Sequence, residues 1–257
     1  MLFDSHAHMD VEEFNEDRDE VLQRIHADKI SFVLNPGVDL ETSNGAVQLA
    51  QKYDWIYAAV GYYPQETCHM DDDVLELIEG LARKPKVVAI GEIGLDYYWD
   101  RTPHDVQQYW FRKQIQLAIR LGKPIIIHDR EAHGDVVSIL KEEKAFENTK
   151  VLFHCYSGSA EMARQLLQEG TCYFSIAGPV TYGKNRKAKA VIETIPLDRM
   201  CIETDSPYLT PEPFRGKRND PALVEYTARK VAELKGVTFE EVAAATMATA
   251  KSIFGIK

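Results

Sequence analysis

Cysteine is scarce in this chain of 257 residues, and none of its four cysteines forms a C-x-x-C pair with another. They stand far apart in the sequence, at Cys68, Cys155, Cys172 and Cys201. The N-terminal stretch "MLFDSHAH" has neither the basic start nor the apolar segment that directs a protein to secretion. Scattered cysteines without such a signal are typical of reduced thiols, so we expect a cytoplasmic protein.

Long apolar runs, low-complexity linkers and internal repeats are also missing. A segment that crosses a membrane needs about 18 apolar residues in succession, and no stretch here approaches that length. With 45% hydrophobic and 27% charged residues, the composition is that of an ordinary globular protein. One α/β barrel commonly has this length, so we predict a single domain over residues 1–257 and no obligate protein partner.

Net positive charge is absent as well, since the formal net charge is −10 at pH 7. This value excludes a protein that coats nucleic acid through general electrostatic attraction. Contacts with phosphate groups would therefore be local. We interpret the basic side chains of "YGKNRKAKA" at 182–190 as a solvated charged face: Lys184, Arg186, Lys187 and Lys189. Barrel enzymes often bind phosphate after their last two strands, so "PEPFRGKRN" at 211–219 offers candidate contacts in Arg215 and Lys217.

Eight short apolar runs are present, rich in β-branched and aromatic residues and separated by longer amphipathic stretches. Nearly continuous apolar runs are typical of strands that are buried on both faces, as in parallel sheets. The runs are 2–4, 30–35, 55–61, 87–91, 124–128, 151–154, 172–178 and 200–205. Between them, the stretch 71–81 has apolar residues at helical spacing behind three aspartates, which predicts a helix.

This alternation predicts an α/β fold, a TIM (β/α)8 barrel in a single domain. A doubly wound open sheet is the alternative. It would usually have a glycine-rich first turn, and "DSHAHMD" at 4–10 occupies that place.

Histidines and acids follow five of the eight runs, and they are the residue types that bind divalent metals. In a barrel, the carboxyl ends of the strands meet on one face. Alternate residues of a strand point to the same side, so His6 and His8 can both face one ion. Six ligands suit two ions better than one ion with an open position. The predicted ligands are His6, His8, Glu92, His128, His154 and Asp205.

Each of these residues also has an ordinary structural interpretation. His128 or His154 could be a hydrogen-bonded core histidine, and Asp205 could cap the turn in "SPYL". Their joint occurrence after strands favours the metal site. Arg130, two residues after His128, is a further candidate phosphate contact because a guanidinium can bind two phosphate oxygens.

The chain resembles the TatD family of metal-dependent deoxyribonucleases, within the amidohydrolase-like superfamily of barrels. The resemblance runs end to end, through "DSHAH", "GEIGLDYY", "HDREAHGDV", "HCYSGS", "GPVTYGKN" and "IETDSPYLTPEPFRGKRNDP". It implies a TIM barrel with two divalent cations, whose identity (Zn, Mg, Mn or Ni) it leaves open. His6, His8 and Asp205 would hold one cation, His128 and His154 the other, and Glu92 would bridge them.

The resemblance also implies metal-dependent hydrolysis of DNA, including 3′-to-5′ trimming of single strands. Three positions depart from the family pattern. Tyr63 in "GYYPQE" stands where a histidine is common, and we expect it to face the substrate. Thr249 replaces an asparagine, which we expect to be a structural change, and Asp129 stands where serine or cysteine is frequent.

For the chemistry, we predict that two metals activate a water for in-line attack on phosphorus. Asp205 would orient that water and take its proton, with Glu92 as the other catalytic carboxylate. Two alternatives remain open. One is an amide, ester or lactone hydrolase, including removal of an aminoacyl group from RNA. The other is a non-catalytic binding module that is stabilised by metal.

Overall fold

The computed structural model describes residues 1–183, 185 and 187–257, and in these residues eight parallel strands form one sheet. The strands lie in the sheet in the order of the sequence, from β1 to β8, and each of the eight predicted runs overlaps one of them. They are β1 Leu2–Asp4, β2 Ile30–Pro36, β3 Ile56–Val60, β4 Val87–Asp96, β5 Ile125–Arg130, β6 Val151–Phe153, β7 Cys172–Ile176 and β8 Met200–Ile202. Sequential parallel order is that of a TIM-type fold and not of a doubly wound sheet, so the predicted fold class is confirmed.

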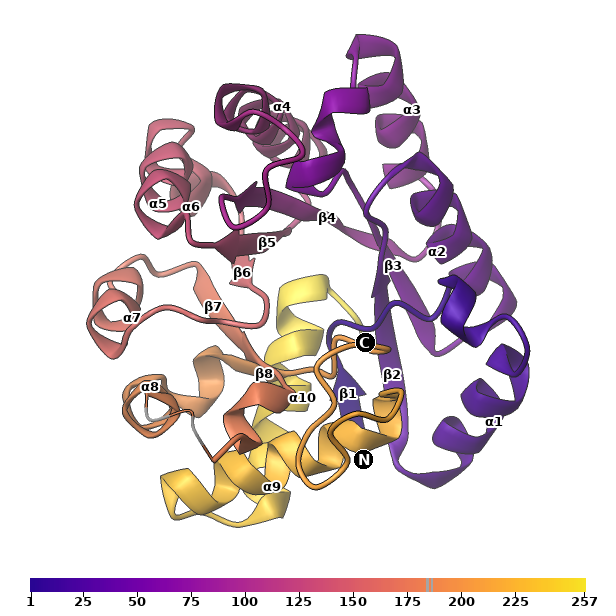
Figure 1. Ribbon diagram of the computed structural model, residues 1–257, viewed down its shortest axis with the longest axis vertical. Helices are drawn as coiled ribbons and strands as arrows, with labels where there is room; N and C mark the ends of the chain where they lie inside the picture. Colours follow the sequence, from indigo (N-terminus) through magenta and orange to yellow (C-terminus); the bar gives the residue numbers. More distant parts are fainter. Residues whose placement is uncertain (184, 186) are drawn as a thin grey trace. The chain divides into compact units, whose positions relative to one another are not determined.

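Helices follow the strands along the chain (Figure 1). The α-helices are α1 Arg18–Asp28, α2 Leu40–Lys52, α3 Asp72–Ala82, α4 His104–Leu121, α5 His133–Glu142, α6 Ala145–Asn148, α7 Ala160–Leu166, α8 Ala188–Thr194, α9 Val224–Lys235 and α10 Phe239–Phe254. Short 3-10 helices are η1 Glu12–Phe14, η2 Pro64–His69, η3 Gly178–Thr181, η4 Leu197–Arg199 and η5 Pro221–Leu223. The predicted helix at 71–81 corresponds to α3, and the Asp71 carboxylate accepts a hydrogen bond from the Val74 amide at its start.

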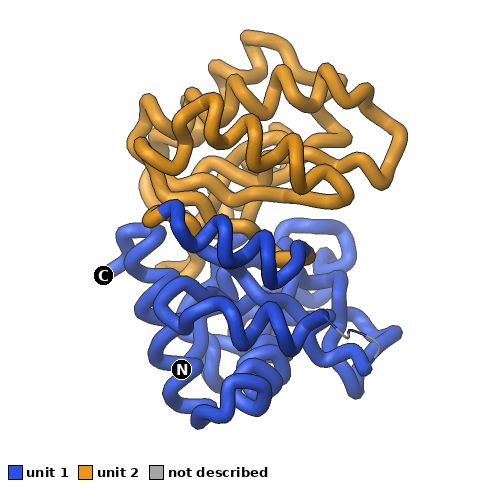
Figure 2. Tube along the Cα trace, turned by 90° about the vertical axis from the view of Figure 1, so that its left-hand side faces the viewer, with its two compact units in different colours: residues 1–35, 158–169, 173–257 blue, residues 36–157, 170–172 orange. Residues whose placement is uncertain are grey.

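The chain divides into two compact units (Figure 2). Unit 1 comprises residues 1–35, 158–169 and 173–257, and unit 2 comprises residues 36–157 and 170–172. Each unit contains part of the predicted site, and the single domain over 1–257 stays a prediction.

In unit 1, β1 pairs with β2 and β7 pairs with β8 through buried apolar residues. The buried Asp4 at the end of β1 accepts hydrogen bonds from the backbone and side chain of Thr204. Burial raises the pKa of the Asp4 carboxyl well above its usual value. Thr249, on α10, is buried and approaches the carbonyl of Leu197, which agrees with the expected structural role.

In unit 2, the register of β4 and β5 determines which polar residues are neighbours. Gly94 lies beside His128, and Asp96 lies beside Arg130. β4 continues five residues beyond the predicted run and ends at Asp96 rather than at Gly91. The additional residues bring a second carboxylate, Asp96, to the same end of the sheet as His128.

Among the described residues, no helix combines the length and the apolar character that crossing a bilayer requires.

Two glycines of unit 2 give opposite predictions for the same substitution. A Cβ on Gly94, whose φ is +149°, would lie 1.9 Å from the carbonyl oxygen of His128. We expect Gly94→Ala to lower the free energy of unfolding by roughly 3 kcal/mol, because either β5 or β4 must move. Gly80, in α3, has no atom within 4 Å of the added Cβ.

Gly80→Ala therefore serves as the matched control, and we expect it to raise the free energy of unfolding by up to about 1 kcal/mol. Urea unfolding of both variants measures the difference. Equal stabilities of the two variants would contradict the close approach of β4 to β5.

Candidate metal centre

Unit 1 brings together three of the predicted ligands. The Nε2 atoms of His6 and His8 are 3.2 Å apart. The Oδ1 atom of Asp205 lies 3.7 Å from the first and 3.4 Å from the second. Both histidines are buried, and the Asp205 side chain is 14% exposed. Three donor atoms thus converge on one small volume.

The backbone explains this convergence, because the chain after β1 runs beside the chain after β8. The Asp205 amide donates to the carbonyl of His6 at 2.8 Å, and the His8 amide donates to the carbonyl of Ser206 at 2.8 Å. Asp205 adopts a left-handed conformation with φ of +57°. Aspartate tolerates this conformation better than most residues, and here it places the carboxylate toward the two imidazoles.

Unit 2 brings together the other three predicted ligands. The Oε1 atom of Glu92 lies 2.7 Å from the Nδ1 atom of His128 and 3.0 Å from the Nε2 atom of His154. The two imidazole nitrogens are 3.2 Å apart. Glu92 and His154 are buried. The second set therefore has the same composition as the first, with two imidazoles and one carboxylate.

Both sets fit a divalent cation. Two nitrogen ligands about 2.0–2.1 Å from a tetrahedral zinc ion are about 3.3 Å apart, close to the nitrogen–nitrogen distance in each set. Imidazole and carboxylate together suit Zn, Ni, Fe and Mn. The assignment of these six residues as ligands stays a prediction that their arrangement supports.

A residue that the sequence did not indicate, Asp96, connects His128 to its surroundings. The Oδ2 atom of Asp96 accepts a hydrogen bond from the Tyr63 hydroxyl at 2.6 Å and lies 3.0 Å from the Nε2 atom of His128. The Nδ1 atom of His128 is left to face Glu92 and His154. A carboxylate on the far nitrogen fixes the tautomer of a metal-binding histidine and increases its basicity.

One signal in the sequence could have indicated Asp96. It lies four residues after Glu92 on β4, and residues at even spacing on a strand share a side.

Three ionisable groups in this network change one another's pKa values. Burial would raise the pKa of Asp96, but the hydrogen bonds from His128 and Tyr63 outweigh it and lower the pKa to about 2. Burial would lower the pKa of His128, but its hydrogen bonds with Asp96 and Glu92 outweigh it and raise the pKa above its usual value. Burial and Asp96 together raise the pKa of Tyr63, so its hydroxyl remains a donor.

Tyr63 itself lies against a predicted ligand. Its ring packs edge-on against His128 with centroids 4.7 Å apart, and its hydroxyl binds Asp96. The residue therefore supports His128, and its predicted contact with substrate stays a prediction.

The candidate phosphate contacts are exposed and lie against aromatic rings. The guanidinium carbon of Arg130 is 3.8 Å from the ring centroid of Tyr98, and that of Arg215 is 4.2 Å from the ring centroid of Tyr182. The Lys217 ammonium lies 5.8 Å from the Phe214 centroid. Their contacts with substrate stay predictions.

Other charged side chains have local roles. Arg218 forms an ion pair with Asp17. Lys187 and Lys189 are exposed, as expected for a solvated face, whereas Lys184 and Arg186 lie outside the described residues. Asp129 lies 2.7 Å from the Nδ1 atom of His133.

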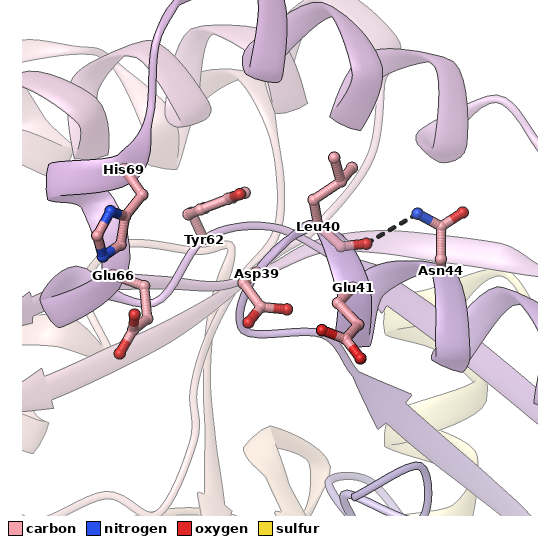
Figure 3. Close-up of a pocket in the computed structure, with 7 residues that line it drawn as sticks. All are labelled: Asp39, Leu40, Glu41, Asn44, Tyr62, Glu66 and His69. Atoms are coloured by element: carbon pink, nitrogen blue, oxygen red, sulfur yellow. Dashed lines mark hydrogen bonds between the residues drawn. The ribbon is translucent and has the colours of Figure 1, made fainter.

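A pocket of about 460 Å³ in unit 2 is lined by other residues, among them Asp39, Glu41, Glu66 and His69 (Figure 3). Asp39 caps α2 by accepting a hydrogen bond from the Thr42 amide at 2.8 Å. None of the predicted ligands lines this pocket, so it is separate from the ligand set of unit 2.

Comparison with known proteins supports the resemblance that the motifs indicated. Residues 3–255 match the family described as TatD related DNase. The chain is 48% identical over 256 residues to an uncharacterized metal-dependent hydrolase of Bacillus subtilis, YabD, and the match covers 100% of each chain. It is 32% identical to the 3′-5′ ssDNA/RNA exonuclease TatD of Citrobacter rodentium, covering 99% of this chain and 98% of that one.

The fold is also that of a solved relative. The TatD homologue YjjV of Escherichia coli superposes with a TM-score of 0.92 at 29% identity, covering 100% of this chain and 98% of that one.

Asp96→Asn tests the support of His128. One oxygen of Asp96 faces His128 and Tyr63 and the other accepts from two backbone amides, whereas asparagine has a single acceptor oxygen and no charge. We therefore expect affinity for the cation in unit 2 to fall about 10- to 100-fold. Titration against a chelator of known affinity measures the change. Asp100→Asn, an exposed carboxylate in the same loop, is the matched control and should leave affinity unchanged. An unchanged affinity in the Asp96 variant would contradict the network.

The raised pKa of His128 gives a pH dependence whose sign reverses with metal. In metal-free protein, a histidine whose pKa is raised by folding contributes its full stabilisation of the folded state below pH 6.5, its pKa in the unfolded chain. This contribution is lost as pH rises through the pKa that the histidine has in the folded state. A bound cation needs the neutral imidazole, so protons compete with it.

In EDTA, we therefore expect the wild type to exceed His128→Gln in free energy of unfolding by a margin that grows as the pH falls from about 8 to about 6. With saturating metal the advantage should shrink over the same range. Urea unfolding at both pH values measures it, and changes of the same sign in both conditions would contradict the assignment of His128 as a ligand.

Proposed function

The chain belongs to the TatD-related family of metal-dependent hydrolases, and on that premise we propose that it hydrolyses phosphodiester bonds of DNA, removing nucleotides from the 3′ end of single strands. The observation that supports this most is the pair of ligand sets, one in each unit, each with two imidazoles and one carboxylate. We propose one divalent cation for each set.

Divalent cations at these positions would supply a water of lowered pKa and neutralise charge on the phosphate oxygens. Asp205 is the group placed to orient the attacking water and take its proton, since its side chain is partly exposed. Glu92 is buried between two imidazoles and acts by holding their orientation. Its implied role as a bridge between two cations stays a prediction.

Nucleic acid as substrate is supported by the relatives and by local charge. The family is described as a DNase, and a relative at 32% identity is named a 3′-5′ ssDNA/RNA exonuclease. The net charge of −10 opposes general binding of a polyanion, so local groups must supply the attraction. We propose that Arg130, Arg215 and Lys217 contact phosphates of the strand.

A direct assay tests the proposed reaction. Metal-stripped protein is incubated with Mg²⁺, Mn²⁺, Zn²⁺ or Ni²⁺ and a 5′-labelled single strand, beside a panel of carboxyl esters, lactones and aminoacyl-RNA. We expect a ladder that shortens from the 3′ end with at least one metal. Asp205→Asn and His128→Ala should lower the rate by about 100-fold or more. Asp100→Asn is again the control.

Two outcomes would reject the proposal. DNA that stays intact under every metal while esters are cleaved would identify an acyl hydrolase. Tight metal binding without turnover of any substrate would identify a binding module.

A further inference from the structure

Two exposed aromatic side chains follow directly after the buried Asp96. Tyr98 is 49% exposed and Trp99 is 47% exposed, although large apolar side chains are normally covered. Both lie in the loop after β4, two and three residues from the carboxylate that supports His128. Exposed aromatic surface therefore follows, along the chain, the carboxylate that pairs with a predicted metal ligand.

The two rings and Arg130 form one cluster, which we call the aromatic platform. The Tyr98 and Trp99 rings meet edge to face with centroids 4.8 Å apart. The Arg130 guanidinium carbon lies 3.8 Å from the Tyr98 centroid and 5.5 Å from the Trp99 centroid. Arg130 is itself exposed. The platform thus combines flat apolar surface with one positive charge.

Hydrogen bonds connect the platform to His128. The Oδ1 atom of Asp96 accepts from the backbone amides of Tyr98 and Trp99 at 3.0 Å and 3.1 Å. The other oxygen of the same carboxylate pairs with His128, which lies two residues before Arg130 on β5. One buried carboxylate therefore positions both the predicted ligand and the platform.

The backbone of the platform loop is fixed from the protein interior by Gln65, which is buried. Its Nε2 atom donates to the carbonyls of Asp96 and Trp99 at 2.7 Å and 2.8 Å. Its Oε1 atom accepts from the amides of Arg101 and Thr102 at 2.9 Å and 3.0 Å. Rings that are exposed on a fixed backbone lose little freedom when a ligand stacks on them.

We propose that the aromatic platform stacks a nucleobase of a single-stranded nucleic acid, with Arg130 on an adjoining phosphate. Every base has a flat face, so aromatic stacking tolerates any sequence, and only an unpaired base can reach the rings. The proposal deepens the proposed function and rests on it for the kind of substrate. It gives an acidic chain a local source of affinity that does not depend on general electrostatic attraction.

The test measures binding, not turnover. The Mn²⁺-loaded full chain is titrated into two fluorescein-labelled strands of eight nucleotides with phosphorothioate linkages, which resist hydrolysis. One strand has thymine bases and the other is abasic throughout. Anisotropy should show the wild type binding the base-bearing strand at least about fivefold more tightly than the abasic strand.

In the double variant Tyr98→Ala/Trp99→Ala, the difference in affinity between the two strands should vanish, while the affinity for the abasic strand should stay the same. The double variant Tyr98→Phe/Trp99→Phe should keep the difference, because rings remain. Arg130→Ala should weaken both strands alike and lower the salt dependence of binding by about one phosphate contact.

Tyr109→Ala is the matched control in the same unit. Tyr109 is 50% exposed, meets Trp110 edge to face at 5.0 Å and has the Lys113 ammonium 5.3 Å from its ring centroid. It thus has the same chemistry in α4 instead of the loop after β4, and its loss should not change the preference for bases.

Three results would overturn the proposal: equal binding of both strands by the wild type, a preserved difference in the alanine double variant, or no binding of either strand. The result of this binding assay does not depend on the result of the hydrolysis assay. A base preference that the alanine variant loses, without cleavage of DNA under any metal, would keep the platform and reject phosphodiester hydrolysis. Cleavage of DNA without a preference for the base-bearing strand would keep phosphodiester hydrolysis and reject the platform.

Discussion

The charge on Asp96 is the constraint on which the site of unit 2 depends. A buried carboxylate that stays ionised must be compensated by donors, and here four surround it: the Tyr63 hydroxyl, the His128 imidazole and the amides of Tyr98 and Trp99. Each donor is consequently fixed in place. The orientation of a predicted metal ligand, the ring of Tyr63 and the start of an exposed loop all follow from one ionised group.

Unit 1 obtains the same kind of ligand set by a different physical route. There the backbone of residues 5–8 runs along that of residues 202–206, and main-chain hydrogen bonds bring His6 and His8 to Asp205. The left-handed conformation of Asp205 is the local strain that this arrangement accepts. Side-chain substitutions around this set should therefore matter less for its geometry than substitutions that alter the path of the chain.

The sequence predicts the fold well and the site in part. All eight strands were found because buried parallel strands have continuous apolar runs. The six ligands were predicted because they follow those runs, and the structure brings them together in two groups of three. Asp96 was missed because β4 continues past Gly91, and because its partners Tyr63 and His128 are 33 and 32 residues away. Hydrogen bonds between side chains on separate strands depend on register and rotamer, which apolar periodicity does not report. For the same reason the hydrogen bond from the Tyr63 hydroxyl to Asp96 was not predicted, and the expected contact of Tyr63 with substrate stays a prediction.

The proposed substrate is a polyanion, whereas the chain itself carries a net negative charge, so electrostatic repulsion would oppose binding. Without a cation, carboxylates add negative charge at or beside each ligand set: Asp205 in unit 1, and in unit 2 Glu92 together with Asp96, which lies behind His128. A divalent cation would outweigh the single carboxylate of the first set and balance Glu92 and Asp96 in unit 2, so occupancy would change the local potential from repulsive to neutral or attractive. Attraction of the strand is then coupled to readiness for hydrolysis. Stacking on uncharged rings complements this arrangement because it adds affinity that neither the net charge nor the metal content alters.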